Sequence, residues 1–493
     1  EMITTDPKRP VIIQGSAGSG KTTVALHRLG WLLHKGNSHA RAENTRVIVM
    51  NKSLQIYVSS TLPSMGINGV DAITFNSWAL SVIRHATRGK AFFKYRELPE
   101  FVEKIKFSNG ILGALSQFVS QQVRDVDAAI SREFLTNEKL FKLWKESHNK
   151  AIQPRLKDFK HDVSESNLPI KEKQVALDYV QNLLTDQEDY VGDLYKLLSD
   201  EKLLGSFLPA DPKLGEHLSY LSRMVDNNRR KNHLDYYDMS LILRLIQLKH
   251  GGLPNKHGGI SEFDHLVVDE AQDFGPVEFS IMMDSVGDKR DLTIVGDVSQ
   301  KILFSRKFIG WENILDNLEI KKDTLIQLEV SFRCTVPIMN LARKVEGRKD
   351  PVSFGRPGSP VVWHRAVDQN DFLETLADWV NGLMEKDPYK LIALICRYPK
   401  QAMELKDELE RMISCEVRIG HRDQFSFEPG VIISNIHQIK GLEFDAVALI
   451  NPSEEFYPSK NIESRNMIYV GITRAQEDLL VIGTNSFSKV LLS

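Results

Sequence analysis

The chain has 493 residues, of which 42% are hydrophobic and 26% are charged. This ordinary globular composition excludes a disordered or fibrous chain, and the length suggests roughly three domains at about 150 residues each. The formal net charge of −2 excludes a surface that is strongly basic throughout. It is compatible with a local basic groove that binds nucleic acid.

The number of cysteines and the hydropathy of the chain indicate in which compartment the protein is expected. Cys334, Cys396 and Cys415 are too few and too scattered for a disulfide framework or a zinc cluster. Sparse cysteine favours a reducing compartment, so we expect a cytoplasmic protein. No apolar run approaches the roughly 20 residues that span a bilayer, so no membrane contact is expected. Because the chain begins at Glu1 and not at a methionine, we expect it to be a piece of a longer protein.

Short apolar segments recur along the chain and are typical of strands buried on both faces, as in parallel sheets. They form two clusters, one before about residue 300 and one after about residue 360, which predicts an α/β fold with two domains. The predicted strands are Val11–Gln14, Arg46–Met50, Ala72–Phe75, His265–Asp269, Leu292–Gly296, Leu391–Cys396, Val431–Asn435, Ala446–Ile450 and Leu479–Gly483.

The strand signal disappears between Ala79 and Asn232. Leucines and valines between Leu177 and Leu198 recur at helical spacing, which predicts a helical insertion in the first α/β domain. The expected division has a first domain of residues 1–79 and 232–325, an insertion of residues 80–231 and a second domain of residues 326–493.

A glycine-rich loop follows the first predicted strand. It fits the pattern G-x-x-x-x-G-K-[ST], with a helical pattern opening at Thr23. Glycines let successive N–H groups face one anion, and the helix N-terminus adds partial positive charge. Lys21 would reach the β- and γ-phosphates of ATP, and the Thr22 hydroxyl would bind Mg²⁺. The predicted ATP-binding residues are Gly15, Ser16, Ala17, Gly18, Ser19, Gly20, Lys21, Thr22 and Thr23.

The predicted strand from His265 ends in a carboxylate pair. Asp269 suits Mg²⁺ binding, directly or through a water, and Glu270 suits orienting and deprotonating an attacking water. An isolated Asp-Glu pair is often only a solvated strand end. Together with the phosphate-binding loop, the pair predicts ATP hydrolysis with ATP and Mg²⁺ as cofactors.

These motifs together resemble the UvrD/Rep/PcrA branch of the superfamily 1 helicases. Asp269–Asp273 is similar to that branch's Walker B motif. Further segments follow in the family's order, namely Gly296–Gln300 (motif III), Leu328–Arg333 (motif IV), His437–Asp445 (motif V) and Tyr469–Ala475 (motif VI). The resemblance covers nearly the whole chain outside the insertion. It implies two RecA-like P-loop NTPase domains with parallel sheets.

The resemblance also implies roles for individual residues. Gln300 would sense the γ-phosphate, and Arg333 and Arg474 of the second domain would neutralise charge on the transferring phosphoryl group. Because Lys21 and Glu270 belong to the first domain, ATP would lie between the domains. Its γ-phosphate would hold the cleft closed, and hydrolysis would release it.

Three further residues are assigned to the nucleotide by the same resemblance. Phe332 resembles the aromatic that stacks on adenine, with plain core packing as the alternative. Glu443 resembles the carboxylate that contacts the ribose, with loop stabilisation as the alternative. Gly441 of the same motif is predicted to bind the nucleotide as well.

The sequence departs from the family where its members grip DNA. Typical members have Thr-Phe-Thr-Asn-Lys where this chain has Ile48–Lys52, and Leu303 and Ser305 replace two stacking aromatics after motif III. Each base–aromatic stack contributes on the order of 1–3 kcal/mol, so we expect a weaker grip on a single strand. Only about 100 residues separate motifs IV and V, which leaves no room for a large second insertion.

These departures point to a subgroup. The helical segment Thr23–Leu33 and the segment Gly310–Ile314 resemble HelD-type proteins, which use the same ATPase core to bind bacterial RNA polymerase and clear it from nucleic acid. The insertion is where we expect specificity for RNA polymerase or another protein subunit to lie.

Two stretches of the insertion are basic. Ile83–Phe107 interleaves basic residues with Phe92, Phe93 and Tyr95, and Lys139–Lys160 contains Trp144. Such segments form either a nucleic-acid track or the solvated faces of amphipathic helices, and the second interpretation is favoured.

The favoured hypothesis is an ATP-driven helicase or translocase that acts on DNA, most readily single-stranded DNA. One alternative is a HelD-like factor that remodels RNA polymerase without unwinding. The other is the motor subunit of a repair or anti-phage defence system in which another chain supplies the nuclease.

Overall fold

The computed structural model describes residues 3–4, 10–15, 18–96, 98–257, 259–287, 291–297, 325–328, 333–348, 350–352, 355–420 and 425–492. The predicted site residues Ser16, Ala17, Gln300 and Phe332 lie outside this described part. The altered motif III positions and the HelD-like segment Gly310–Ile314 lie outside it as well.

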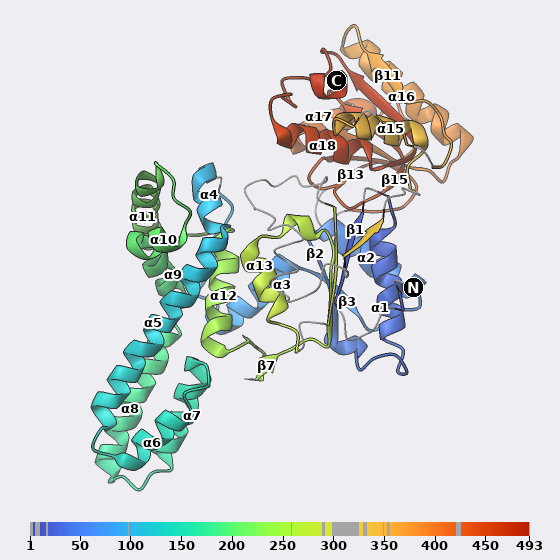
Figure 1. The fold of residues 1–493 in the computed structure, drawn as a ribbon. Helices are drawn as coiled ribbons and strands as arrows, with labels where there is room; N and C mark the ends of the chain where they lie inside the picture. Colours follow the sequence, from blue (N-terminus) through green and yellow to red (C-terminus); the bar gives the residue numbers. More distant parts are fainter. Residues whose placement is uncertain are drawn as a thin grey trace.

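Two six-stranded sheets form the centres of two α/β domains (Figure 1). The predicted strands of the first domain are confirmed, with ends shifted by at most one residue. Neighbouring strands of this sheet pair in parallel. Their spatial order is β10 (Leu325–Leu328), β1 (Val11–Gly15), β9 (Leu292–Gly296), β8 (His265–Val268), β2 (Thr45–Val49) and β3 (Asp71–Thr74).

The second sheet is also parallel throughout its pairs. Together the sheets confirm the predicted fold class of two RecA-like domains with parallel sheets. The strand order is β11 (Val362–Arg365), β16 (Ala475–Gly483), β15 (Phe444–Ile450), β12 (Leu391–Cys396), β14 (Gly430–Asn435) and β13 (Val417–Ile419).

Three strands of these sheets were not predicted, and all three lie at sheet edges. They are β10, β11 and β13, whose side chains are mostly half-buried or exposed. An edge strand lacks neighbours on one side and so lacks the continuous apolar run of a central strand. Because β10 pairs with β1, the first sheet extends to Leu328, beyond the predicted domain end at residue 325.

Helices cover both faces of each sheet. Alternate residues of β1 show this, since Ile13 packs into the cluster with α1 and α2, whereas Ile12 packs into the cluster on the opposite face. The first domain contains α1 (Lys21–Leu32), α2 (Lys52–Ser64), α3 (Phe75–Ala86), α12 (Asp238–His250), α13 (Pro276–Met283) and the short helices η1 (Ala42–Asn44) and η2 (Ala271–Asp273). The second contains α15 (Val336–Val345), α16 (Gln369–Lys386), α17 (Pro399–Leu409), α18 (Ile462–Ile472) and α19 (Lys489–Leu492).

The insertion is helical, as its periodicity predicts. Its helices are α4 (Glu100–Lys106), α5 (Asn109–Phe134), α6 (Glu138–Glu146), α7 (Ile152–Ser164), α8 (Ile170–Gln187), α9 (Tyr190–Ser199), α10 (Glu201–Phe207) and α11 (Leu214–Arg230). Two short ribbons also form, a parallel pair of β4 (Phe93–Lys94) with β5 (Leu234–Asp235) and an antiparallel pair of β6 (Leu253–Pro254) with β7 (Ile260–Ser261).

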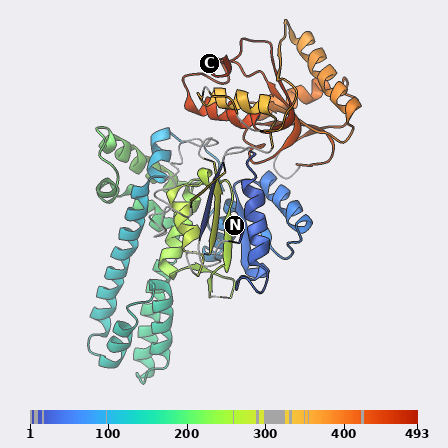
Figure 2. The same cartoon turned by 45° about the vertical axis from the view of Figure 1, so that its right-hand side comes forward.

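The insertion has two parts with separate packing. The half near the first sheet shares that domain's core, through residues such as Leu115, Leu194 and Leu221. The far half, made by α6, α7, α8 and the end of α5, has its own core and projects away from both sheets (Figures 1 and 2). A projecting arm with an independent core presents much of its surface to solvent.

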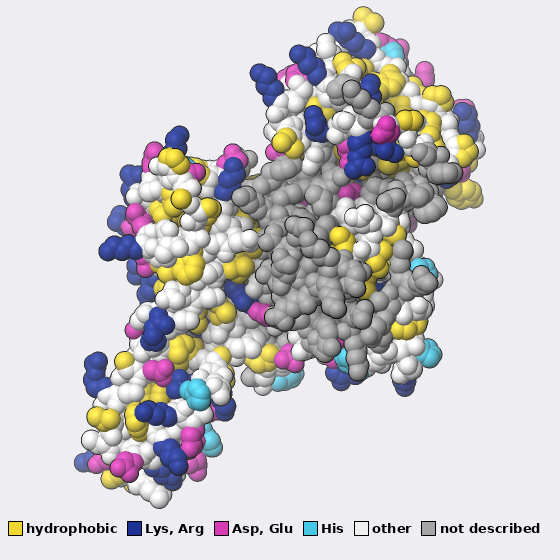
Figure 3. Space-filling model, viewed as in Figure 1, with side chains coloured by type: hydrophobic (Ala, Val, Ile, Leu, Met, Phe, Trp, Pro, Cys, Tyr) yellow, Lys and Arg dark blue, Asp and Glu magenta, His cyan; other side chains and the backbone are white. Residues whose placement is uncertain are grey.

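The basic stretches of the insertion fit the solvated-face interpretation. Trp144 is only 1% exposed, its Nε1–H donates to Asp127 at 2.9 Å, and the Arg155 guanidinium lies 3.6 Å from its ring centre. It therefore packs in the core of the arm and cannot stack on a base. Phe92 and Tyr95 are exposed, but on the face seen in Figure 3 the Lys and Arg side chains of the insertion alternate with Asp and Glu.

No helix among the described residues combines the length and the apolarity that crossing a bilayer requires.

Candidate nucleotide-binding site

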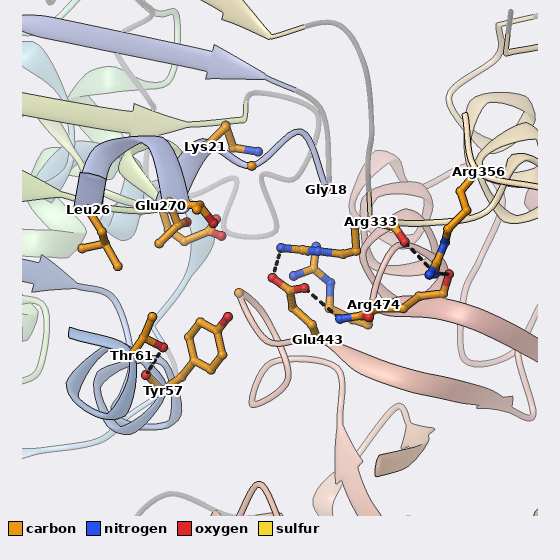
Figure 4. A pocket seen from close by; sticks show the side chains of 15 residues that line it. Gly18, Lys21, Leu26, Tyr57, Thr61, Glu270, Arg333, Arg356, Glu443 and Arg474 are labelled. Carbon is orange, nitrogen blue, oxygen red and sulfur yellow. Dashed lines mark hydrogen bonds and ion pairs between the residues drawn. The ribbon is translucent and has the colours of Figure 1, made fainter. Parts of the chain in front are cut away.

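Residues from both α/β domains line one cavity (Figure 4). Its volume of about 270 Å³ is slightly below the roughly 300–1,000 Å³ typical of small-molecule sites. The described lining residues of the first domain are Gly18, Gly20, Lys21, Thr22, Thr23, Leu26, Tyr57, Thr61 and Glu270. Those of the second are Arg333, Arg356, Gly441, Glu443, Arg474 and Gln476.

The glycines of the phosphate-binding loop have the conformations that the motif requires. Gly18 and Gly20 have φ angles of 72° and 79°, in the left-handed region that side chains disfavour. At Gly15 a Cβ atom would lie 2.3 Å from the Ser19 hydroxyl and 2.9 Å from Leu328 Cβ, so only glycine fits. Gly20 caps α1 and has no side chain to bond the first turn, and the first residues of α1 line the cavity, where a helix N-terminus suits an anion.

Thr22 and Asp269 lie side by side where β8 meets α1. The Thr22 hydroxyl donates to an Asp269 carboxylate oxygen at 3.0 Å. Burial, and next the charge of Glu270, raise the pKa of Asp269 to about 6, against the opposing effects of Thr22 and Lys21. A buried carboxylate of this kind gains from a nearby cation, and hydroxyl and carboxylate oxygens are the ligands that Mg²⁺ prefers.

This donor set fits Mg²⁺ held together with a phosphate. The described residues contain no group of three or more His, Cys, Asp or Glu side chains arranged to hold a metal by themselves. Mg²⁺ commonly uses one or two carboxylates and completes its shell with water and substrate phosphates. Thr22 and Asp269 therefore suit a cation that arrives with its nucleotide.

Glu270 occupies a strained and strongly charged position. Its φ angle of 54° is uncommon for a residue with a side chain, costs roughly 1–3 kcal/mol, and such strain concentrates at functional sites. Burial alone would raise its pKa, but Lys440, Lys21 and Arg474 together lower it. Gln272 also donates to its carboxylate at 2.5 Å. Glu270 is therefore held as an ionised carboxylate facing the cavity.

The two predicted arginines reach the same cavity from the second domain. The backbone N–H of Arg333 donates to the Gly18 carbonyl at 3.2 Å, which ties it to the phosphate-binding loop. Arg474 lies in the turn between α18 and β16 and is 1% exposed, with its guanidinium donating to the Leu442 and Val470 carbonyls at 3.1 Å. Burial, and next the charge of Arg333, lower the pKa of Arg474.

Motif V brings the second domain against α2. Gly441 has a φ angle of 82°, and a Cβ atom there would lie 3.1 Å from the Leu54 side chain. Glu443, two residues later, accepts hydrogen bonds from the Arg333 guanidinium and from Gln476, the latter at 3.0 Å. The predicted ribose ligand is thus also the residue that orients Arg333 in this structure.

Several residues that line the cavity are not among the predicted site residues. Arg356 donates to the Arg333 carbonyl at 3.2 Å and to the Gln476 carbonyl at 2.7 Å. It therefore holds the backbone of Arg333 next to that of Gln476. Gln476 directly follows motif VI, and extending that motif by one residue finds it. Arg356, Tyr57 and Thr61 carry no local signal, because they reach the cavity only through the packing of the two domains.

Two family models match parts of this chain. The model of the UvrD/REP helicase N-terminal domain matches residues 1–307, and the model of the UvrD-like helicase C-terminal domain matches residues 415–486. The first match covers more than half of the chain and includes the phosphate-binding loop and the acidic pair.

Curated relatives are distant and longer. The chain is 21% identical to a probable DNA helicase II homolog of Mycoplasma capricolum over 414 residues, which cover 81% of this chain and 48% of that protein. It is 23% identical to the ATP-dependent DNA helicase UvrD2 of Mycobacterium tuberculosis over 438 residues, which cover 84% of this chain and 54% of that protein. The chain thus spans about half of the length of the curated relatives it matches.

One solved structure is similar in a smaller part. The C-terminal domain of a possible DNA helicase from a Lactobacillus matches 33% of this chain and 92% of that chain, at 20% identity and a TM-score of 0.27. A similarity this low supports no conclusion about function.

Proposed function

The chain belongs to the UvrD/REP helicase family, and on that premise we propose that it is an ATP-hydrolysing superfamily 1 motor that acts on single-stranded DNA. One observation carries the proposal. Lys21 and Glu270 of the first domain line the same cavity as Arg333 and Arg474 of the second. A site divided in this way makes nucleotide chemistry depend on how the two domains meet.

The phosphate-binding loop and its helix would hold the triphosphate. Lys21 and the N–H groups at the start of α1 would face the β- and γ-phosphates. Thr22 and Asp269 would hold Mg²⁺, which neutralises phosphate charge when bound. The tight fit of Gly15 against Ser19 and Leu328 fixes the course of the loop on which these contacts depend.

Glu270 is the candidate for activating water. In hydrolysis the water oxygen bonds to the γ-phosphorus, the bond from that phosphorus to the bridging oxygen breaks, and ADP leaves. The proton of the attacking water goes to a base, and Glu270 is an ionised carboxylate that faces the cavity beside Lys21. Its strained backbone and its bond from Gln272 would hold the carboxylate in place for this step.

The arginines would stabilise the charge that develops on the phosphoryl group. Planar guanidinium groups suit this task, and both belong to the second domain. Arg356 and Glu443 would keep Arg333 oriented toward the cavity. Loss of the γ-phosphate removes an anion that both domains contact, so hydrolysis would loosen their contact and produce motion.

Several finer assignments stay predictions. They are the contacts of Gln300 and Phe332, the ribose contact of Glu443, the polymerase-remodelling alternative, the role in a defence or repair assembly, and partner binding through the insertion. The curated relatives are described as DNA helicases, which favours DNA over a polymerase as the object of the motor.

The test is the ATPase rate of the purified protein alone and with single-stranded DNA, duplex DNA and RNA. We expect single-stranded DNA to increase the rate most, and Lys21→Ala to reduce every rate to background. A wild-type rate that no nucleic acid changes would contradict the motor, and a response to RNA alone would contradict the assignment to DNA.

A further inference from the structure

One wall of the cavity carries no charged side chain and comes from the part of α2 that follows the family-aligned segment Ile48–Lys52. Tyr57 and Thr61 lie one turn apart on α2 and line the cavity together with Leu26 of α1 (Figure 4). The opposite walls carry Lys21, Glu270 and the arginines. The cavity therefore has a charged half and an aromatic half.

The Tyr57 ring is held in place from both domains. It packs at the edge of the α1–α2 core of the first domain and also against the core of the second. Its ring centre lies 5.7 Å from that of Phe427, with the planes at 60°. Because this packing restrains the ring, a flat ligand would meet a preformed surface and lose little by ordering it.

The surroundings of the Tyr57 hydroxyl suit the ribose of a nucleotide. Burial, and next the charge of Glu443, raise the pKa of this phenol, so it stays a neutral donor. Glu443 is the residue predicted to contact the ribose. A ligand whose phosphates lie at Lys21 and whose sugar lies near Glu443 would have its base beside Tyr57.

We propose that Tyr57 is an aromatic surface on which the nucleoside of the bound nucleotide rests, in addition to the predicted contact of Phe332, with Leu26 and Thr61 beside it. This inference rests on the proposed ATP site and deepens it. It makes α2 a contributor to nucleotide recognition, and Tyr57 acts on binding of the nucleoside and not on phosphate chemistry. Base–aromatic stacking supports an effect of roughly 5- to 100-fold in affinity.

The test separates the nucleoside from the phosphates by using two ligands. Binding of ADP and of inorganic tripolyphosphate is measured by titration calorimetry for wild type, Tyr57→Ala and Tyr57→Phe. We expect Tyr57→Ala to weaken ADP roughly 5- to 100-fold while tripolyphosphate binding changes less than about twofold. Tyr57→Phe keeps the ring but loses the hydroxyl donor, so it should lose less ADP affinity than Tyr57→Ala.

Two control variants distinguish stacking from domain packing. Phe427→Ala removes the ring that packs behind Tyr57 and is not itself a lining residue, and Tyr389→Ala removes an exposed tyrosine far from it in the chain. If Tyr57 acts as proposed, Tyr389→Ala should bind ADP like wild type, and Phe427→Ala should weaken ADP clearly less than Tyr57→Ala does.

Each other outcome overturns the inference. Equal weakening of ADP and tripolyphosphate, no weakening of either, or a loss in Phe427→Ala equal to that in Tyr57→Ala would each show that Tyr57 is only a packing residue. Wild-type protein that binds neither ligand would instead refute the proposed ATP site itself, and this inference would fall with it.

Discussion

Lys440 of the second domain donates to both carboxylate oxygens of Asp273 in the first, at 2.6 and 2.5 Å, and its ammonium also lies 3.9 Å from Glu270. Lys440 lies between β14 and β15, and Asp273 ends η2 just after the acidic pair. Both side chains are buried. One cation from the second domain is therefore placed against the proposed catalytic carboxylate of the first.

Removing this cation should damage both stability and turnover. Lys440→Met leaves Asp273 buried beside Glu270 without this partner, and breaking one side of a buried pair costs about 3–5 kcal/mol. We expect a lower unfolding temperature by calorimetry and a loss of ATPase activity. Lys440→Arg keeps the charge and should retain more of both. If Lys440→Met unfolds and hydrolyses like wild type, the bridge has no role in coupling the domains.

Neutralising the proposed base should stop hydrolysis and spare binding. Glu270→Gln keeps the size of the side chain but cannot accept the proton, so kcat should fall about 10²- to 10⁴-fold while ADP affinity stays near wild type. Glu410→Gln makes the same chemical change at an exposed position and should leave the rate unchanged. Near-normal hydrolysis by Glu270→Gln would remove Glu270 from the mechanism.

The phosphate-binding loop should not tolerate a side chain at Gly15. Gly15→Ala places a methyl group within 2.3 Å of the Ser19 hydroxyl and 2.9 Å of Leu328 Cβ, so the loop or β10 must shift. We expect weaker binding of inorganic tripolyphosphate. The matched variant is Gly215→Ala in α11, where a Cβ atom meets nothing within 4 Å. It should bind normally and be neutral or slightly more stable, since alanine favours helix.

Acid should destabilise the first domain through His265. Its imidazole is buried in β8 and hydrogen-bonded to Thr293 at 3.0 Å, and burial, with smaller effects of Arg28 and His39, lowers its pKa to about 3. In the unfolded chain its pKa is about 6.5, so between about pH 6.5 and pH 3 the unfolded state binds the additional proton and stability falls as pH falls.

This contribution is measurable by urea unfolding at pH 7.5 and pH 5. The proton on unfolded His265 should lower the unfolding free energy by about 2 kcal/mol between these values. His265→Gln lacks that titration and should lose correspondingly less stability over the same range. Parallel losses in wild type and variant would show that other groups account for the pH dependence.

The features that the sequence predicts correctly are those whose signal lies in neighbouring residues of the chain. The central strands are continuous apolar runs because both of their faces are buried, and Gly15–Thr22 needs its residue types for a turn and an anion whatever surrounds them. The acidic pair follows directly on such a strand. In these places the residues that carry the signal are close neighbours in the chain, so periodicity and spacing are sufficient to find them.

The sequence by itself thus determined two parallel α/β domains, the helical insertion and the residues of the phosphate-binding loop and acidic pair. Only the tertiary structure decided that Trp144 packs inside the arm, that Lys440 meets Asp273, and that Tyr57 lines the cavity. It also decided the edge strands, whose pattern is weak because one side has no neighbour. The physical reason is the same in each case, since these contacts join residues far apart in the chain and depend on how whole elements pack.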